Sequence, residues 1–244
     1  MQNLQQTSGI DKDMVIVTGG SRGIGKAIAA KFAAAGHTVV LCARNENDLL
    51  LAAEELGKQF SHATIKTFAA DLAVKNEAIS FGQWCLHQGA PFILVNNAGA
   101  YLPGNLWDEA GENMEQMMNS NFFSAYHLTR KLLPAMIKKG KGHIFNICSV
   151  ASLHAYEGGG SYSVSKFALN GFSQNLRHEL KKTGIKVTAV FPGAVMTDTW
   201  GNFDNSSNRI METEDIAVMV FAAASLSNQA VVEEILIRPL LGDL

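Results

Sequence analysis

Short apolar runs alternate along the chain with longer segments in which apolar residues recur at helical spacing. The short runs are rich in β-branched side chains, as is typical of strands buried on both faces of a parallel sheet. The runs predict strands at residues 14–18, 38–42, 64–68, 92–95, 142–147, 186–191 and 233–237. The helical spacing predicts helices at residues 23–35, 46–59, 75–88, 112–138, 159–182 and 213–226.

This alternation predicts an α/β fold, a Rossmann-like doubly wound parallel sheet of about seven strands with helices on both faces. A length of 244 residues suits one such domain. No internal repeat, low-complexity block or linker indicates a second domain. Residues 1–10 are polar, without the basic start and apolar run of a signal peptide, and are predicted to form a flexible tail. Residues 11–244 are predicted to form the single domain.

Composition narrows the class of function. A net charge of −2 gives no reason to expect a nucleic-acid partner, and no apolar run reaches the length of a membrane span. Cys42, Cys85 and Cys148 lie in apolar stretches without paired spacing, which indicates reduced thiols and a cytoplasmic protein. The loop histidine His154 has no partner at metal-ligand spacing, so no metal site is predicted.

A glycine-rich turn follows the first predicted strand and precedes a predicted helix. It reads Thr18-Gly-Gly-Ser-Arg-Gly-Ile-Gly25. Glycines at these positions let the backbone approach a pyrophosphate, and the helix N-terminus adds N–H donors and a positive dipole end. The spacing is G-x-x-x-G-x-G rather than the common G-x-G-x-x-G. The turn therefore indicates a dinucleotide site, the alternative being a tight connection alone.

Later in the chain, a serine hydroxyl, a tyrosine phenol and a lysine ammonium occur at a spacing that could bring them together. Ser149 precedes Tyr162, and Lys166 follows Tyr162 at i+4. On a helix, i and i+4 side chains lie on one face, about 6 Å apart at Cβ. A phenol titrates near pH 10, and a nearby cation lowers its pKa toward the range useful for proton transfer. The pattern predicts a Tyr proton donor tuned by Lys166, with Ser149 holding a substrate oxygen. Taken alone, a Tyr–Lys pair at this spacing is far more often a solvated surface pair.

These motifs occur in one order: Thr18–Gly25, Asn96-Asn-Ala-Gly99, Ser149, Tyr162-x-x-x-Lys166 and Pro192-Gly193. In this order and spacing, from about residue 12 to residue 240, the chain resembles the short-chain dehydrogenase/reductase family in its compact single-domain form. The resemblance implies hydride transfer between a nicotinamide cofactor and a carbonyl carbon. It also implies four catalytic residues, namely Asn121, Ser149, Tyr162 and Lys166.

The resemblance also implies which residues contact the cofactor. They are Gly19, Ser21, Arg22, Gly23, Ile24, Gly25, Arg44, Asp71, Leu72, Asn97, Ala98, Gly99, Tyr162, Lys166, Pro192, Gly193, Val195 and Thr197. An NAD enzyme usually carries an acid at the end of the second strand. Here Ala43 and Arg44 occupy that place, and two guanidiniums, Arg22 and Arg44, suit a 2′-phosphate. The expected cofactor is NADP(H); Glu46 is the alternative ribose ligand if the strand ends later.

The substrate is predicted less sharply. Loops at 100–107, 151–160 and 197–212 carry aromatic residues, of which Tyr156, Trp200 and Phe203 are the candidate substrate contacts. Stretches 142–151, 192–200 and 231–239 are similar to bacterial sepiapterin reductase-like members, which implies a small carbonyl compound such as sepiapterin or a diketone. The alternatives are a 3-oxoacyl thioester on an acyl carrier protein and a non-enzymatic NADPH sensor. Relatives imply a homodimer or homotetramer through helices 112–138 and 159–182.

Overall fold

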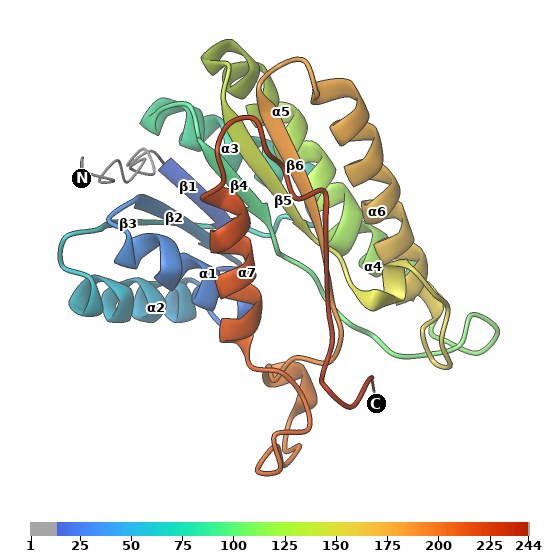
Figure 1. The fold of residues 1–244 in the computed structure, drawn as a ribbon. Helices are drawn as coiled ribbons and strands as arrows, with labels where there is room; N and C mark the ends of the chain where they lie inside the picture. The colour runs from blue at the N-terminus through green and yellow to red at the C-terminus, as the bar shows by residue number, and fades with distance from the viewer. Residues whose placement is uncertain (1–13, 244) are drawn as a thin grey trace, which may run out of the picture.

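A parallel sheet forms the centre of the computed structural model, which describes residues 14–243 (Figure 1). The predicted tail, residues 1–10, lies outside the described residues. The strands are β1 (Met14–Thr18), β2 (Thr38–Ala43), β3 (Thr64–Ala69), β4 (Ile93–Asn96), β5 (Gly142–Ile147), β6 (Ile185–Pro192) and β7 (Glu234–Ile237). Their order in the sheet is β3-β2-β1-β4-β5-β6-β7, and every pairing is parallel. The predicted fold class is therefore confirmed.

Helices cover both faces of this sheet (Figure 1). They are α1 (Gly23–Ala34), α2 (Glu46–Gln59), α3 (Lys75–Gln88), α4 (Asn113–Met118), α5 (Ser124–Lys139), α6 (Gly160–Leu180) and α7 (Thr213–Ala224). A π-helical segment, η1 (Asn119–Phe123), and two 3₁₀ turns, η2 (Val150–Ser152) and η3 (Asp198–Trp200), complete the elements. None of the described helices has the length and apolar character needed to cross a membrane.

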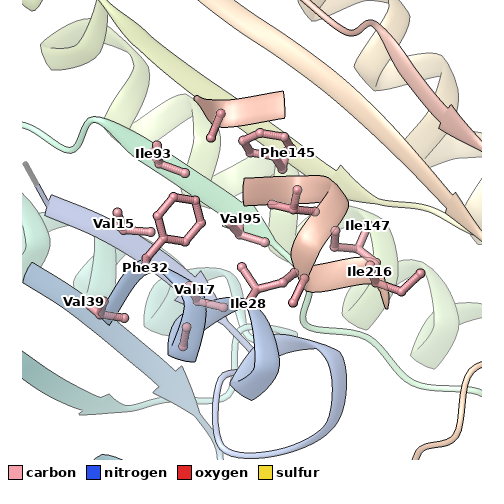
Figure 2. Packing of buried hydrophobic residues seen from close by; sticks show 14 of the residues in the cluster. Val15, Val17, Ile28, Phe32, Val39, Ile93, Val95, Phe145, Ile147 and Ile216 are labelled. Carbon is pink, nitrogen blue, oxygen red and sulfur yellow. The ribbon is translucent and has the colours of Figure 1, made fainter. Parts of the chain in front are cut away.

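Alternate residues of the strands feed two separate hydrophobic cores. Val15 and Val17 of β1 pack with α1, α2 and α7, whereas Met14 and Ile16 pack with α3, α5 and α6. Figure 2 shows the first core, where Phe32 of α1 lies among side chains of the sheet. Because both faces are covered, the central strands β1, β2 and β4 are apolar at almost every position. Fully burying one large apolar side chain contributes about 1.5–3 kcal/mol.

The predicted helix at residues 112–138 contains a π-helical segment in the structure. Helix α4 ends at Met118, the π-helical segment η1 follows, and α5 begins at Ser124. A π turn inserts an extra residue and changes which face a side chain presents, and such bulges are frequent at functional sites. The buried Asn121 lies within this segment. The predicted extent of the helix is confirmed, since residues 113–139 are helical without a gap, but the π segment within it was not predicted.

The strand order reverses between β1 and β4. From β1 the chain continues through β2 to β3 at one edge of the sheet, and from β4 it continues through β5 and β6 to β7 at the other edge. In a doubly wound sheet, ligands bind beyond the carboxyl ends of the strands at this reversal. Because all strands are parallel, the segments that follow β1, β2, β4, β5 and β6 emerge at this same edge. The predicted motifs lie on those segments.

Candidate active site

A cleft of about 430 Å³ opens at the carboxyl edge of the sheet where the strand order reverses. Of the predicted cofactor residues, those that line it are Gly19, Ser21, Arg22, Gly23, Arg44, Asp71, Leu72, Asn97, Ala98, Gly99 and Thr197. Residues that line the cleft but were not predicted are Cys42, Ala43, Asn45, Asp48, Ala70, Ala73, Ala100, Ser120, Asp198 and Thr199. The cleft runs from the glycine turn past the ends of β2 and β4, so its length suits an extended dinucleotide.

The remaining predicted cofactor residues lie outside this lining. Ile24 and Gly25 belong to the start of α1, and Tyr162 and Lys166 to α6. Pro192 ends β6, and the Gly193 N–H donates to the carbonyl of Ile237 at 2.8 Å. Val195 is buried and forms an isolated bridge to Met211. Their contacts with a cofactor stay predictions.

The glycine turn is held in place by Thr18 and Asn97. The Thr18 hydroxyl donates to the carbonyl of Val95 and accepts from the N–H groups of Asn97 and Ala98, both at 2.9 Å. The Asn97 amide donates to the carbonyls of Thr18 at 2.9 Å and Gly19 at 3.2 Å. Asn97 therefore fixes one wall of the cleft against the other.

Gly25 lies where the turn enters α1, and no larger residue fits there. A Cβ at this position would lie 2.3 Å from the Gly19 carbonyl oxygen and 2.5 Å from the Asn97 Nδ2. This tight cradle is what a backbone that wraps a pyrophosphate requires, so the residues present fit a dinucleotide.

Replacing Gly25 by alanine is expected to open the turn, since both neighbours are tied to the sheet. We expect the free energy of unfolding to fall by about 1–3 kcal/mol and NADPH to bind at least about tenfold more weakly. Thermal unfolding and fluorescence titration measure both. The matched control is Gly57→Ala on α2, where a Cβ would meet nothing within 4 Å; it should stabilise the chain by about 0.5–1 kcal/mol. Unchanged NADPH affinity in Gly25→Ala would contradict the cradle.

The two arginines of the cleft differ in their surroundings. Arg22 Nη1 lies 3.1 Å from Asp198 Oδ2, and both side chains are exposed. Arg44 follows the end of β2 and, within residues 14–243, has no ion pair or side-chain hydrogen bond. Glu46, the alternative ribose ligand, begins α2 and is not among the residues that line the cleft. Arg44 is thus the guanidinium most available to an anion in the cleft.

Ser149, Tyr162 and Lys166 come together at the carboxyl end of β5. Ser149 begins η2, where its Oγ accepts from the Ala151 N–H at 3.2 Å. The Ser149 side chain lies near enough to the Tyr162 phenol to oppose the rise in its pKa. The buried Lys166 Nζ donates to the carbonyl of Ile147 at 2.9 Å and lies 5.8 Å from the centre of the Tyr162 ring. The predicted hydroxyl, phenol and ammonium therefore form one cluster.

The ionisation of this cluster differs from the expectation. Burial raises the pKa of Tyr162 to about 12, and the nearby Ser149 side chain opposes this only in part. Burial also lowers the pKa of Lys166 to about 8. The net pKa of Tyr162 thus lies above its usual value, because burial disfavours the phenolate, and the lowering expected from Lys166 stays a prediction. Tyr162 is a protonated phenol at neutral pH, which is the form that donates a proton.

Asn121 joins the loop after β4 to helix α6. Its Oδ1 accepts from the Ala100 N–H at 2.7 Å, and its Nδ2 donates to the Ala100 carbonyl at 3.0 Å. The same Nδ2 donates to Ser165 Oγ at 2.9 Å, one residue before Lys166. This buried amide lies within the π segment. Asn121 thus fixes α6 relative to the loop, and its catalytic role stays a prediction.

Two tyrosines surround Tyr162. The Tyr101 ring meets the Tyr162 ring edge-on, with centroids 4.8 Å apart. Burial raises the pKa of Tyr156, and a side-chain hydrogen bond with Tyr101 adds to the effect. Tyr156 was predicted as a substrate contact, and Tyr101 belongs to the predicted specificity loop 100–107, two residues after the Asn96–Gly99 motif. Trp200 and Phe203, also predicted, pack against each other with centroids 5.2 Å apart on the segment after β6.

The sequence and the fold are similar to those of known proteins. The sequence matches the family described as short chain dehydrogenase over residues 13–208. It is 35% identical over 242 residues to a sepiapterin reductase of Chlorobaculum tepidum, covering 96% of this chain and 98% of that one. A metagenomic short-chain oxidoreductase solved in complex with NADP has a TM-score of 0.83 and 31% identity, covering 95% of this chain and 98% of that one. The L-sorbose reductase of Gluconobacter frateurii, solved with NADPH and L-sorbose, has a TM-score of 0.85 and 27% identity, covering 94% and 96%.

Proposed function

Since the chain belongs to the short chain dehydrogenase family, we propose that it is an NADPH-dependent oxidoreductase that reduces the ketone of a small carbonyl compound to an alcohol. One observation carries the proposal. Tyr162 lies near Ser149 and beside the buried Lys166 ammonium, at the sheet edge where the cleft opens. This arrangement suits proton donation to an oxygen that gains negative charge.

The chemistry of the chain's own residues follows from this geometry. NADPH, when bound, supplies the hydride. The hydroxyls of Ser149 and Tyr162 donate hydrogen bonds to the carbonyl oxygen, which polarises the carbonyl carbon. The Tyr162 proton moves to the oxygen as the alkoxide develops, because a phenol is protonated at neutral pH and is a stronger acid than the alcohol that forms. The nearby Lys166 ammonium stabilises the phenolate that remains.

The cofactor proposed is NADP(H) rather than NAD(H). Ala43 at the end of β2 offers no carboxylate for a ribose hydroxyl, and the next residue, Arg44, presents a guanidinium without a partner in the described chain. The related short-chain oxidoreductase and the sorbose reductase, both solved with NADP or NADPH, support the same choice. Gly19, Asn97 and Asp71 would hold the rest of the dinucleotide along the cleft.

The substrate proposed is sepiapterin or a small diketone. Tyr101 and Tyr156 beside Tyr162, with Trp200 and Phe203 on a neighbouring segment, suit a flat or apolar carbonyl compound. The identity with the sepiapterin reductase of Chlorobaculum tepidum supports this class.

The test is NADPH consumption by the purified protein with sepiapterin, an acetoacetyl thioester and a simple diketone side by side. Preference for sepiapterin or the diketone is the expected result. Preference for the thioester would replace the proposed substrate with a fatty-acid-type 3-oxoacyl group. NADPH binding without turnover on all three would contradict the enzyme and favour a sensor.

We also propose that the protein is a homo-oligomer paired through α5 and α6. Phe167 on α6 and Ile137 on α5 are 46% and 40% exposed, which is high for large apolar side chains. Phe167→Glu is expected to shift the species measured by light scattering from dimer or tetramer toward monomer. Val74→Glu on the start of α3 is a control at an equally exposed apolar residue. A wild-type monomer would contradict this assembly.

A further inference from the structure

We propose that Glu109 is a positioning residue for Tyr162 and acts through Ser161 at the start of α6. The inference rests on the proposed function. Glu109 Oε2 accepts from the Ser161 N–H at 3.2 Å, and Glu109 Oε1 accepts from the Ser161 hydroxyl. Ser161 is fully buried and directly precedes Tyr162. One carboxylate from the loop after β4 thus holds the residue next to the proton donor by two hydrogen bonds.

The same loop also contacts the residues that lead into α6 and the first residue of that helix. The Gly104 N–H donates to the Gly158 carbonyl at 3.0 Å, and the Gly158 N–H donates to Asn105 Oδ1 at 3.2 Å. The chains approach so closely that a Cβ at Gly160 would lie 2.2 Å from the Gly104 carbonyl oxygen and 2.7 Å from Glu109 Oε2. We call this set of contacts between residues 104–109 and 158–161 the loop clasp.

The N-terminus of helix α6 needs a hydrogen-bond acceptor for its first backbone N–H groups. The first N–H groups of a helix have no intrahelical partner, and the residue before α6, Gly159, has no side chain to cap them. Glu109 supplies the acceptor from a distant loop, and its negative charge is favourable at the positive end of the helix dipole. Because Tyr162 lies in the first turn, where helices fray, its position depends on this cap.

The clasp also fixes what lies against the Tyr162 ring. Tyr101, four residues before Asn105 on the same loop, packs edge-on against that ring. Asn121 ties Ala100 to Ser165 further along α6. Glu109 and Asn121 therefore hold the loop against α6 on both sides of Tyr162. A misplacement of about 1 Å in a reacting group can lower turnover about 100-fold.

The experiment compares Glu109→Ala, Glu109→Gln and Glu112→Ala in the full-length protein, with NADPH and the best substrate of the panel. Glu112 is the control because it lies on the same loop, carries the same charge and is exposed, with no side-chain hydrogen bond or ion pair in the described chain. We expect Glu109→Ala to lower kcat about 10- to 100-fold, with KM and the Kd for NADPH changed less than about twofold. Glu109→Gln keeps an acceptor oxygen for the Ser161 N–H and should recover part of the loss.

The outcomes separate this inference from its premises. A Glu109→Ala variant with the kcat of the wild type would overturn the inference. An equal loss of kcat in Glu109→Gln, together with a loss of NADPH binding, would overturn it too, because it indicates general unfolding. If the wild type turns over no ketone, the proposed function fails, and hydrogen exchange of the first turn of α6 then tests the clasp alone. Faster exchange there in Glu109→Ala than in Glu112→Ala supports the clasp, and equal exchange refutes it.

Discussion

Replacing Tyr162 by phenylalanine is expected to lower kcat by about 10²- to 10⁴-fold, the usual contribution of a general acid. The ring remains, so its edge-on contact with Tyr101 and the packing of α6 persist. Only the hydroxyl is lost, and with it the proton that meets the developing alkoxide and the interaction with Ser149. Because Tyr162 does not line the cleft of about 430 Å³, the Kd for NADPH should stay within about twofold.

Stopped-flow or steady-state NADPH oxidation measures kcat, and fluorescence titration measures NADPH binding. Tyr126→Phe on α5 is the matched control: it removes a phenol hydroxyl that only accepts from Arg130 on the surface. Turnover in Tyr162→Phe that equals that of Tyr126→Phe would refute the role of the phenol as proton donor. A loss of NADPH binding in Tyr162→Phe alone would instead assign Tyr162 to holding the cofactor.

Much of the fold is predictable from local patterns. The bounds of β1, β5, α2 and α3 are the predicted ones. Strands of a parallel sheet covered on both faces are continuous apolar runs, which polar turns delimit sharply. At α2 the side chain of Asn45 caps the helix by accepting from the Asp48 N–H, a signal that lies in the sequence itself.

The π segment within the helix at residues 112–138 has no comparable signal. Residues Asn119–Phe123 contain no proline or glycine, and the π turn is stabilised by contacts of Asn121 with Ala100 and Ser165, which are remote in the sequence. The Glu109–Ser161 contact is hidden for the same reason, since a glutamate in a polar loop is otherwise an ordinary solvated residue. Contacts between residues that are remote in the sequence cannot be predicted from the spacing of motifs.

In the candidate site, too, some features could be predicted from spacing and others could not. The spacing of Ser149, Tyr162 and Lys166 predicted their proximity correctly, because i+4 on a helix and a strand end are local geometry. The raised pKa of Tyr162 was not predicted, because spacing reveals the neighbouring cation but not the burial that disfavours the phenolate. For Asn97 the cofactor contact stays a prediction, whereas its hydrogen bonds to the glycine turn emerged only from the structure.

Replacing Arg44 by aspartate is expected to reverse the preference between NADPH and NADH. If the guanidinium makes two charged hydrogen bonds to the 2′-phosphate, each contributes about 1.5–3 kcal/mol, so their loss lowers kcat/KM for NADPH by at least about 100-fold. The new carboxylate would also repel the phosphate and would accept from the ribose hydroxyl of NADH, as an acid at this strand end commonly does. Because Ala43 next to it is small, the change introduces no steric conflict at the end of β2.

Arg22→Ala is the discriminating comparison. Arg22 already pairs with Asp198 at 3.1 Å, so a phosphate must compete with that carboxylate for the guanidinium. Removing Arg22 should therefore lower the NADPH-to-NADH ratio of kcat/KM less than Arg44→Asp does. Steady-state kinetics with both cofactors and one ketone measure the ratio. An unchanged ratio in Arg44→Asp, or a larger change in Arg22→Ala, would move phosphate recognition from the end of β2 to the glycine turn.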